Sequence, residues 1–135
     1  MFSKALRLAV LLHFVLTQIV LASPASAASS SIPPLEVWRS DGCLNDPNDA
    51  RQLSFRAQPS MINEDGMTIE VCRAFCQSNK FKYAGVEFAR ECWCENKIRD
   101  PRSEAPAGAC SMACTGDSKK TCGGANAIEI QHRVL

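Results

Sequence analysis

The sequence has little histidine and no recognisable catalytic triad. Its 135 residues include two histidines, His13 and His132, and His13 lies in an N-terminal segment that we expect to be removed. The chain therefore offers no Ser/His/Asp or Cys/His constellation for nucleophilic catalysis. A carboxylate pair such as Glu87 and Glu91 is the remaining option for a glycosidase, but so short a chain leaves little room for a deep cleft. We predict a protein without enzymatic activity.

Cysteine pairs of the C-x-x-C kind, which are typical of zinc sites, are also missing. The spacings between nearby cysteines are instead C-x-x-x-C, C-x-C and C-x-x-x-C. The acidic residues Asp46 and Asp49 lie in a turn-rich segment, but their spacing fits no calcium loop, and we interpret them as part of a solvated turn. The sequence thus predicts no metal and no cofactor.

A large charge imbalance is absent as well. The chain has 15 Lys and Arg residues and 14 Asp and Glu residues. Loss of an N-terminal segment containing Lys4 and Arg7 leaves 13 basic residues against the same 14 acidic ones, a net charge of −1. This balance gives no argument for nucleic acid or an anionic membrane surface as a partner. No second long apolar run follows the first, so we expect no membrane span in the mature chain.

What the sequence does have begins with the order of a secretory signal in residues 1–27. The basic residues Lys4 and Arg7 precede a mostly apolar run, and Ala25-Ser26-Ala27 has the small residues of a cleavage motif. We therefore predict a secreted protein, located outside the cell or in a cell wall. Residues 28–36 are expected to form a linker, and residues 37–131 a single domain that is a monomer.

Eight cysteines lie in the predicted mature chain, and an even number in a short secreted protein indicates a disulfide framework. Cys72 and Cys76 are four residues apart, so on a helix they share one face with a rise of roughly 6 Å between them. Cys92 and Cys94 are two apart, so on a strand they share a face at a spacing of roughly 6.6 Å. A helix lying across that strand would make two neighbouring disulfides, with parallel and crossed pairing both open.

Local patterns predict the elements around these cysteines. Thr68 is a good N-cap for a helix that ends near Gln77 or Asn79. The expected buried stripe of this helix consists of Val71, Cys72, Phe75 and Cys76. Strands are expected at residues 81–89 and 91–96, joined by a turn near residues 89–91, with a short strand around residues 51–55 and a final strand over residues 127–131 that pairs with the opening segment.

Six motifs together resemble the WSC domain. They are Gly42-Cys43, the MT-x-x-x-C-x-x-x-C run from Met67 to Cys76, YAG-x-E from Tyr83 to Glu87, ECWC from Glu91 to Cys94, C-x-x-x-C-x-GD from Cys110 to Asp117, and CGG from Cys122 to Gly124. The resemblance implies a compact α+β fold, small and disulfide-rich, in which one main helix is stapled across an antiparallel sheet as in PAN/apple modules. The disulfides that it implies are Cys43 with Cys110, Cys72 with Cys92, Cys76 with Cys94, and Cys114 with Cys122.

The same resemblance implies a fungal-like protein that binds carbohydrate, with a cell-wall glucan as the usual proposal. Because side chains alternate along a strand, we expect Trp93 on the sheet face opposite the cysteines, where its ring would stack on a sugar. The other expected carbohydrate contacts are Tyr83, Glu87, Asn96 and Asp117. Packing within the domain is an equal alternative for Trp93 and the competing interpretation for Tyr83 and Phe88, and a structural hydrogen bond or ion pair is the alternative for Glu87. The alternative function is a secreted cysteine-rich module or effector that binds protein, so the expected partner is a wall polysaccharide or glycoprotein.

Overall fold

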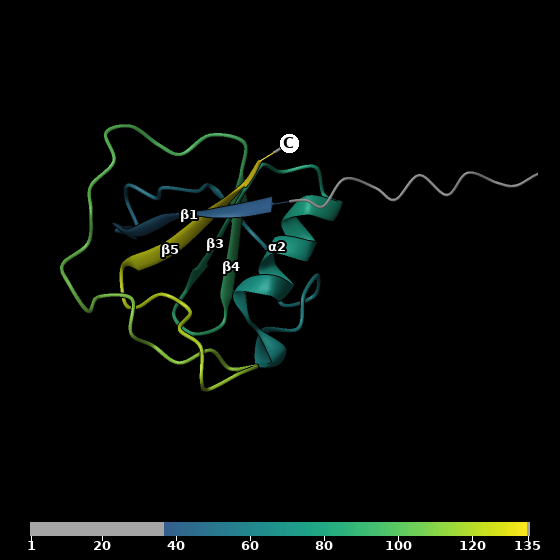
Figure 1. Cartoon of the computed structure of the whole chain (residues 1–135). Helices are drawn as coiled ribbons and strands as arrows, with labels where there is room; N and C mark the ends of the chain where they lie inside the picture. The colour runs from purple at the N-terminus through teal and green to yellow at the C-terminus, as the bar shows by residue number, and fades with distance from the viewer. Residues whose placement is uncertain (1–36, 135) are drawn as a thin grey trace, which may run out of the picture. The chain divides into compact units, whose positions relative to one another are not determined.

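The computed structural model describes residues 37–134, which form an antiparallel sheet of five strands with one α-helix packed beside it (Figure 1). The predicted signal at residues 1–27 and the predicted linker at residues 28–36 lie outside the described residues. In chain order the elements are β1 (Val37–Asn45), β2 (Phe55–Arg56), the 3-10 turn η1 (Glu64–Gly66), α2 (Ile69–Ser78), β3 (Tyr83–Glu87), β4 (Glu91–Glu95) and β5 (Ala127–Val134). The predicted fold class, a small disulfide-rich α+β domain, is confirmed.

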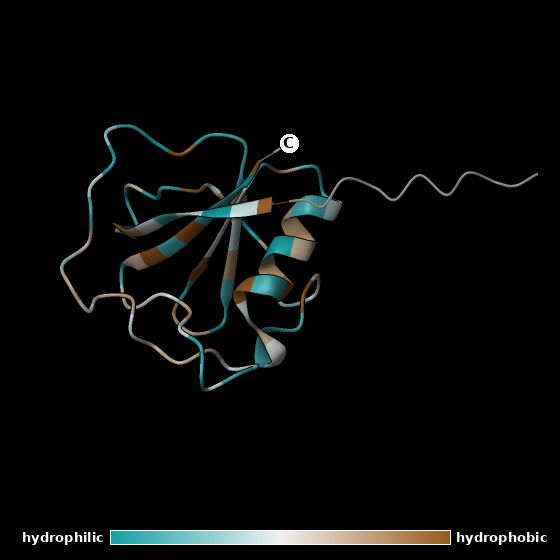
Figure 2. Cartoon of the chain, viewed as in Figure 1, coloured by the Kyte–Doolittle hydropathy of each residue, from teal (hydrophilic) through white to brown (hydrophobic). Residues whose placement is uncertain are grey.

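The strand order is β1-β5-β3-β4-β2, so the last strand is inserted between the first and the third. As predicted, β5 returns the chain to the opening segment, and Val37 pairs with Val134 at one end of the ladder. The side chains of β5 alternate between apolar and polar over Ile128 to Gln131, and Figure 2 shows this alternation in colour. The apolar residues of β5 therefore point to one sheet face.

Helix α2 begins where the sequence predicts. The Thr68 hydroxyl accepts a hydrogen bond from the Val71 amide at 3.2 Å, which is the N-cap arrangement. Cys72 and Cys76 are fully buried against the sheet. The predicted buried stripe is wrong at Val71, which is 38% exposed, and Ile69 is buried in its place. Ile69 lies three residues before Cys72 and so shares its face of the helix.

Four disulfides connect these elements, with the pairing that the resemblance implies. They are Cys43–Cys110, Cys72–Cys92, Cys76–Cys94 and Cys114–Cys122. Two of them join α2 to β4. Cys72 bonds to Cys92 and Cys76 bonds to Cys94, so of the two arrangements that the spacing left open the pairing is parallel and not crossed.

The core has two parts, one on each face of the sheet. The first lies under α2 and contains the helix-to-strand disulfides together with Val86 and Met67. The second lies on the opposite face and consists of Leu44, Leu53, Trp93, Ile98, Ile128 and Ile130. Leu53 and Ile98 come from loops, so this face of the sheet is covered by loops where the other is covered by a helix. In the described residues no helix is long and apolar enough to cross a membrane.

Candidate functional site

Trp93 lies on the predicted face of the sheet, but its ring is not presented to solvent. The residue is only 8% exposed and packs among the aliphatic side chains of the second core. Gly85, directly opposite in β3, makes room for this packing, because a Cβ atom there would lie 2.6 Å from Cδ1 of Ile128. The guanidinium of Arg51 covers the ring at 4.3 Å from its centroid. Of the two interpretations of Trp93, packing is therefore the correct one, and the exposed stacking ring is wrong.

Arg51 joins two buried carboxylates over this tryptophan. Its Nη1 atom lies 2.7 Å from Oδ2 of Asp46 and also contacts Oε2 of Glu87. Asp46 and Glu87 are both fully buried, whereas the Arg51 side chain is 20% exposed. We call Asp46, Arg51 and Glu87 the buried triad. Of the two interpretations of Glu87, the structural ion pair is therefore the one that the geometry supports. Asp46 is buried, so its interpretation as part of a solvated turn is wrong.

The buried triad was missed because its members are far apart in the sequence. A short strand was expected around residues 51–55, but β2 covers only Phe55 and Arg56, and Arg51 lies in the preceding loop. The loop places the Arg51 side chain between the two carboxylates. In a strand, the alternation of side chains would have decided to which sheet face Arg51 points. The one sequence signal was a single arginine in a segment rich in aspartate and asparagine.

Glu87 has an unusual protonation equilibrium. Burial raises the pKa of Glu87 from its ordinary value of 4.5 to about 7, against the opposing effect of the Arg51 charge and with help from the Asp46 charge. One of its oxygens, Oε1, is buried without a hydrogen-bond partner. A protonated carboxyl would lose less on burial than an ionised one, so the folded state favours the proton.

We expect stability to fall as the pH rises through this range. Folded Glu87 holds a proton between pH 4.5 and about 7 that the unfolded chain releases, so the free energy of unfolding decreases with pH across that window, by at most about 3 kcal/mol. Urea denaturation at the two ends of the window measures the change. The Glu87→Gln variant, which cannot titrate there, should show a smaller decrease. An equal decrease in both proteins would contradict this origin.

Two other predicted contacts, Tyr83 and Asn96, lie together at the start of β3. Tyr83 is half-buried, with its ring 5.8 Å from the ring of His132 and 5.3 Å from Nζ of Lys82. Asn96 is exposed, and its side-chain oxygen accepts a hydrogen bond from the Lys82 amide at 3.0 Å. The structure thus brings these two together, with Glu87 at the other end of the same strand.

Asp117 lies away from the sheet, in the loop closed by the Cys114–Cys122 disulfide. Its carboxylate accepts a hydrogen bond from the amide of Lys119 at 3.0 Å, which is a local turn contact. The five predicted contacts therefore do not converge on one surface.

Phe88 is the large aromatic residue that the turn between β3 and β4 presents to solvent. It is 46% exposed, and both Phe88 and Ala89 have positive φ angles, 54° and 66°. Residues other than glycine rarely adopt this backbone conformation, because it brings the Cβ atom too close to the backbone. The turn lies one residue earlier than predicted, so Phe88 leaves the strand, and packing within the sheet is the wrong interpretation for it.

Backbone hydrogen bonds hold this turn in place. The Phe88 amide donates to the Gly124 carbonyl at 3.4 Å, the Ala89 amide to the Cys122 carbonyl at 3.0 Å, and the Thr115 amide to the Ala89 carbonyl at 3.1 Å. At Gly123, with φ of +70°, a Cβ atom would lie 2.3 Å from the Val86 carbonyl oxygen, so the approach requires glycine. The exposed ring is therefore carried on a rigid support.

Met112 and Asn126 extend this surface. Met112 is 37% exposed and exchanges backbone hydrogen bonds with Cys122 and Gly123, at 2.8 and 2.9 Å, so it lies along the same glycine segment. Asn126 is exposed in the turn that links Gly124 to Ala127. We call Phe88, Met112 and Asn126 the turn surface. It combines an aromatic ring, a flexible apolar side chain and an amide.

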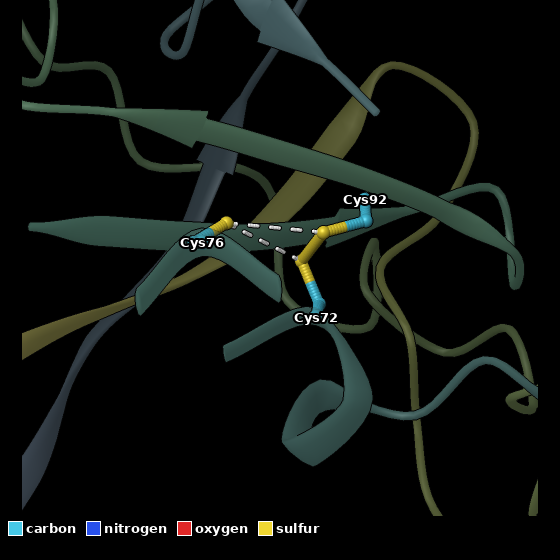
Figure 3. Close-up of side chains that lie close together, drawn as sticks. All are labelled: Cys72, Cys76 and Cys92. Carbon is cyan, nitrogen blue, oxygen red and sulfur yellow. Dashed lines mark hydrogen bonds between the residues drawn. A yellow bond between two sulfur atoms is a disulfide. The ribbon is translucent and has the colours of Figure 1, made fainter. Parts of the chain in front are cut away.

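Three cysteine sulfurs also lie close together, in an arrangement that resembles a metal site. The sulfur of Cys76 lies 4.0 Å from that of Cys72 and 3.9 Å from that of Cys92. Figure 3 shows how the three side chains point toward one another. Cys72 and Cys92 are bonded to each other, however, and Cys76 is bonded to Cys94. Sulfurs in disulfides are not thiolate ligands, so the cluster is two adjacent disulfides.

The helix stapled to an antiparallel sheet by two disulfides defines a small disulfide-stabilised α+β module. The family model described as WSC domain matches residues 41–124. The chain is 34% identical over 97 residues to a WSC domain-containing protein of Arthroderma benhamiae. It therefore belongs to the WSC domain family, whose members are commonly carbohydrate-binding or cysteine-rich modules.

Other relatives are larger proteins with different names. The chain is 27% identical over 109 residues to a putative fungistatic metabolite of Chaetomium globosum, a match that covers 80% of this chain and 48% of that protein. It is 33% identical over 90 residues to the xylosyltransferase oxt of Drosophila melanogaster, covering 66% of this chain and 10% of that protein. The Arthroderma match covers 70% of this chain and again 10% of the relative. The chain thus spans between a tenth and about half of these relatives.

Proposed function

We propose that the chain is a secreted module that binds a neutral cell-wall polysaccharide, with glucan as the first candidate, and that it does so without catalysis. The observation that carries this proposal is the exposed ring of Phe88 on its rigid turn. An aromatic face that is already fixed stacks on a pyranose ring with little loss of conformational entropy. The exposed amide of Asn126, in the turn after the Gly124 to which Phe88 is hydrogen-bonded, can bond sugar hydroxyls.

Two further features support binding without chemistry. Glu87, half of the carboxylate pair considered for a glycosidase, is buried and bonded to Arg51. Glu91 bonds the indole of Trp93 at 3.2 Å and the guanidinium of Arg56 at 3.1 Å. Neither carboxylate stands in an open cleft with a free approach for a glycosidic bond. Relatives that are named only for the WSC domain fit the same proposal.

Phe88→Ala is expected to abolish detectable binding of the mature protein to insoluble β-glucan while leaving its stability within about 0.5 kcal/mol of wild type. Alanine and phenylalanine both carry a Cβ atom and are equally strained at the positive φ angle of this position, so the substitution removes only the ring. Co-sedimentation with β-glucan, chitin, xylan and cellulose measures the binding. Val71→Ala, which shortens a 38% exposed apolar residue on α2, is the control and should pellet as wild type does.

The same assay separates the alternative function. Trp93→Ala is a poor probe, because removing a buried ring costs about 3 to 5 kcal/mol and unfolds part of the domain. If wild type pellets with none of the four polymers, the polysaccharide proposal fails. A protein partner that contacts Phe88 and Met112 then becomes the better proposal, since exposed aromatic and methionine side chains also suit protein interfaces.

A further inference from the structure

A hollow lies at the opposite end of β3 from the turn surface. It has a volume of about 360 Å³ and is lined by Lys80, Lys82, Asn96, His132, Arg133 and Val134. Figure 1 shows why these residues meet: the C-terminal end of α2, the start of β3 and the end of β5 all lie at the same end of the domain. Pairing of Tyr83 with His132 across β3 and β5 fixes this arrangement.

A second hollow of about 340 Å³ shares two of these residues. It is lined by Ala74, Gln77, Ser78, Lys80 and Arg133. Because Lys80 and Arg133 line both, the two hollows adjoin and form one elongated depression along the end of α2. We call it the basic groove. The lining of the basic groove extends from Ala74 of α2 to Val134 at the end of β5.

The lining of the basic groove includes three basic side chains and no acidic one. Lys80, Lys82 and Arg133 supply the basic groups, and none of the residues that line the two hollows is Asp or Glu. The carboxylate of Asp41 lies behind one lining residue, His132, at 2.6 Å from its Nδ1 atom. The nearest carboxylate along β4, Glu95, lines a different hollow, where it accepts hydrogen bonds from the Ser54 hydroxyl and the Asn96 amide. A chain that is nearly neutral overall thus concentrates positive charge here.

Several polar groups that line the groove are donors. The side-chain oxygen of Asn96 is already bonded to the Lys82 amide, which leaves the NH₂ group of Asn96 to donate outward. The carbonyls of Cys76 and Gln77 at the end of α2 accept hydrogen bonds from the amides of Phe81 and Lys80, both at 2.9 Å. These two carbonyls are therefore satisfied within the chain, and the lysines with the Asn96 NH₂ group favour a ligand that carries acceptors and negative charge.

We propose that the basic groove binds an acidic polysaccharide, one that carries a carboxylate on its sugar rings. The ammonium groups of Lys80 and Lys82 suit repeated carboxylates along a chain, and Arg133 adds positive charge beside them. Nucleic acid fits less well, because the nearby ring of Tyr83 is half-buried between Lys82 and His132, and Phe81 packs against the first core, so neither ring is well exposed for a base. This inference goes beyond the proposed function, because it uses a separate surface and a charged polymer.

The test is the affinity of the mature protein for polygalacturonate, measured by affinity electrophoresis at low and high salt. Wild type should bind, and its affinity should fall steeply with salt. The double variant Lys80→Glu/Lys82→Glu should lose about tenfold or more in affinity, because it replaces two attractive contacts with repulsive ones. The control is Lys97→Glu/Lys119→Glu, which makes the same charge change at two exposed lysines that do not line the groove. It should stay within about twofold of wild type.

Each of the other outcomes overturns the proposal. The proposal fails if the wild-type protein does not bind polygalacturonate. It also fails if both double variants lose the same affinity, because an equal loss indicates attraction to net charge alone. Equal affinity for single-stranded DNA of matched charge would show a general polyanion surface. Phe88→Ala should bind polygalacturonate as wild type does, while Lys80→Glu/Lys82→Glu should still pellet with glucan. The two surfaces can therefore fail independently, and circular dichroism of each variant confirms that it is folded.

Discussion

Arg51→Ala is expected to lower the free energy of unfolding by about 3 to 5 kcal/mol, a large part of the stability of a domain this small. The substitution leaves Asp46 and Glu87 buried side by side without their cation. It also removes the group that lies over Trp93 and opens the second core to water. Urea or guanidinium denaturation of the oxidised protein measures the loss.

The control for Arg51→Ala is Arg90→Ala. The Arg90 side chain is 49% exposed and lies 2.7 Å from the carboxylate of Asp65, which is 85% exposed. Exposed ion pairs contribute about 0 to 1 kcal/mol, so this variant should remain near wild type. A loss for Arg51→Ala no larger than that for Arg90→Ala would contradict the importance of the buried triad.

A second variant tests whether the unpaired charges cause the loss. The triple change Arg51→Met, Asp46→Asn and Glu87→Gln removes all three charges and keeps similar volumes. The variant has no unpaired buried charge, which is the costly feature of Arg51→Ala, so it should recover part of the lost stability even though its buried amides keep a cost of their own. A triple variant as unstable as Arg51→Ala would assign the effect to lost packing over Trp93.

Removing both disulfides between α2 and β4 is expected to unfold the domain. The Cys72–Cys92 and Cys76–Cys94 bonds close segments with sequence separations of 20 and 18 residues. In the chain-entropy model each supplies roughly 3 kcal/mol. Their combined loss, with two pairs of fully buried sulfurs, approaches the roughly 5 to 15 kcal/mol that a whole domain has available. The variant with alanine at all four positions should show an unfolded circular dichroism spectrum and rapid hydrogen exchange.

The matched comparison is the variant Cys114→Ala/Cys122→Ala. This disulfide closes a segment with a sequence separation of 8 residues and, although its sulfurs belong to the first core, it does not bond α2 to the sheet. The variant should remain folded but weaken glucan binding, because Cys122 and Thr115 support the turn that carries Phe88. A folded four-alanine variant would show that the two cores suffice without the α2 disulfides.

Much of the fold follows from local sequence patterns. The spacing of Cys72 and Cys76 fits a helix face and that of Cys92 and Cys94 a strand face, and each pattern depends on a few neighbouring residues. Strand alternation likewise placed Trp93 on the correct face. The burial of the Trp93 ring could not be predicted in the same way, because it depends on Leu53 and Ile98. Both residues come from loops, and no local sequence pattern determines the course of these loops.

The candidate sites depend on contacts between distant segments, and this is why they were harder to predict. A shift of one residue in the expected turn was enough to assign Phe88 to the sheet and hide its exposure. The basic groove combines Lys80 and Lys82 with Arg133, which are separated by some 50 positions. Net charge sums over the whole chain and therefore carries no information about such a local concentration.

The pairing of β1 with β5 has a consequence for how such a domain can be built into other proteins. Val37 and Val134 are partners in the ladder, so the chain enters and leaves the domain at neighbouring points. A domain with adjacent ends can be inserted into a surface loop of a host protein while separating the two sides of that loop very little. This geometry suits a family whose matches cover only a tenth of some relatives. For protein engineering, it makes the domain a candidate for grafting as an internal insertion as well as for terminal fusion.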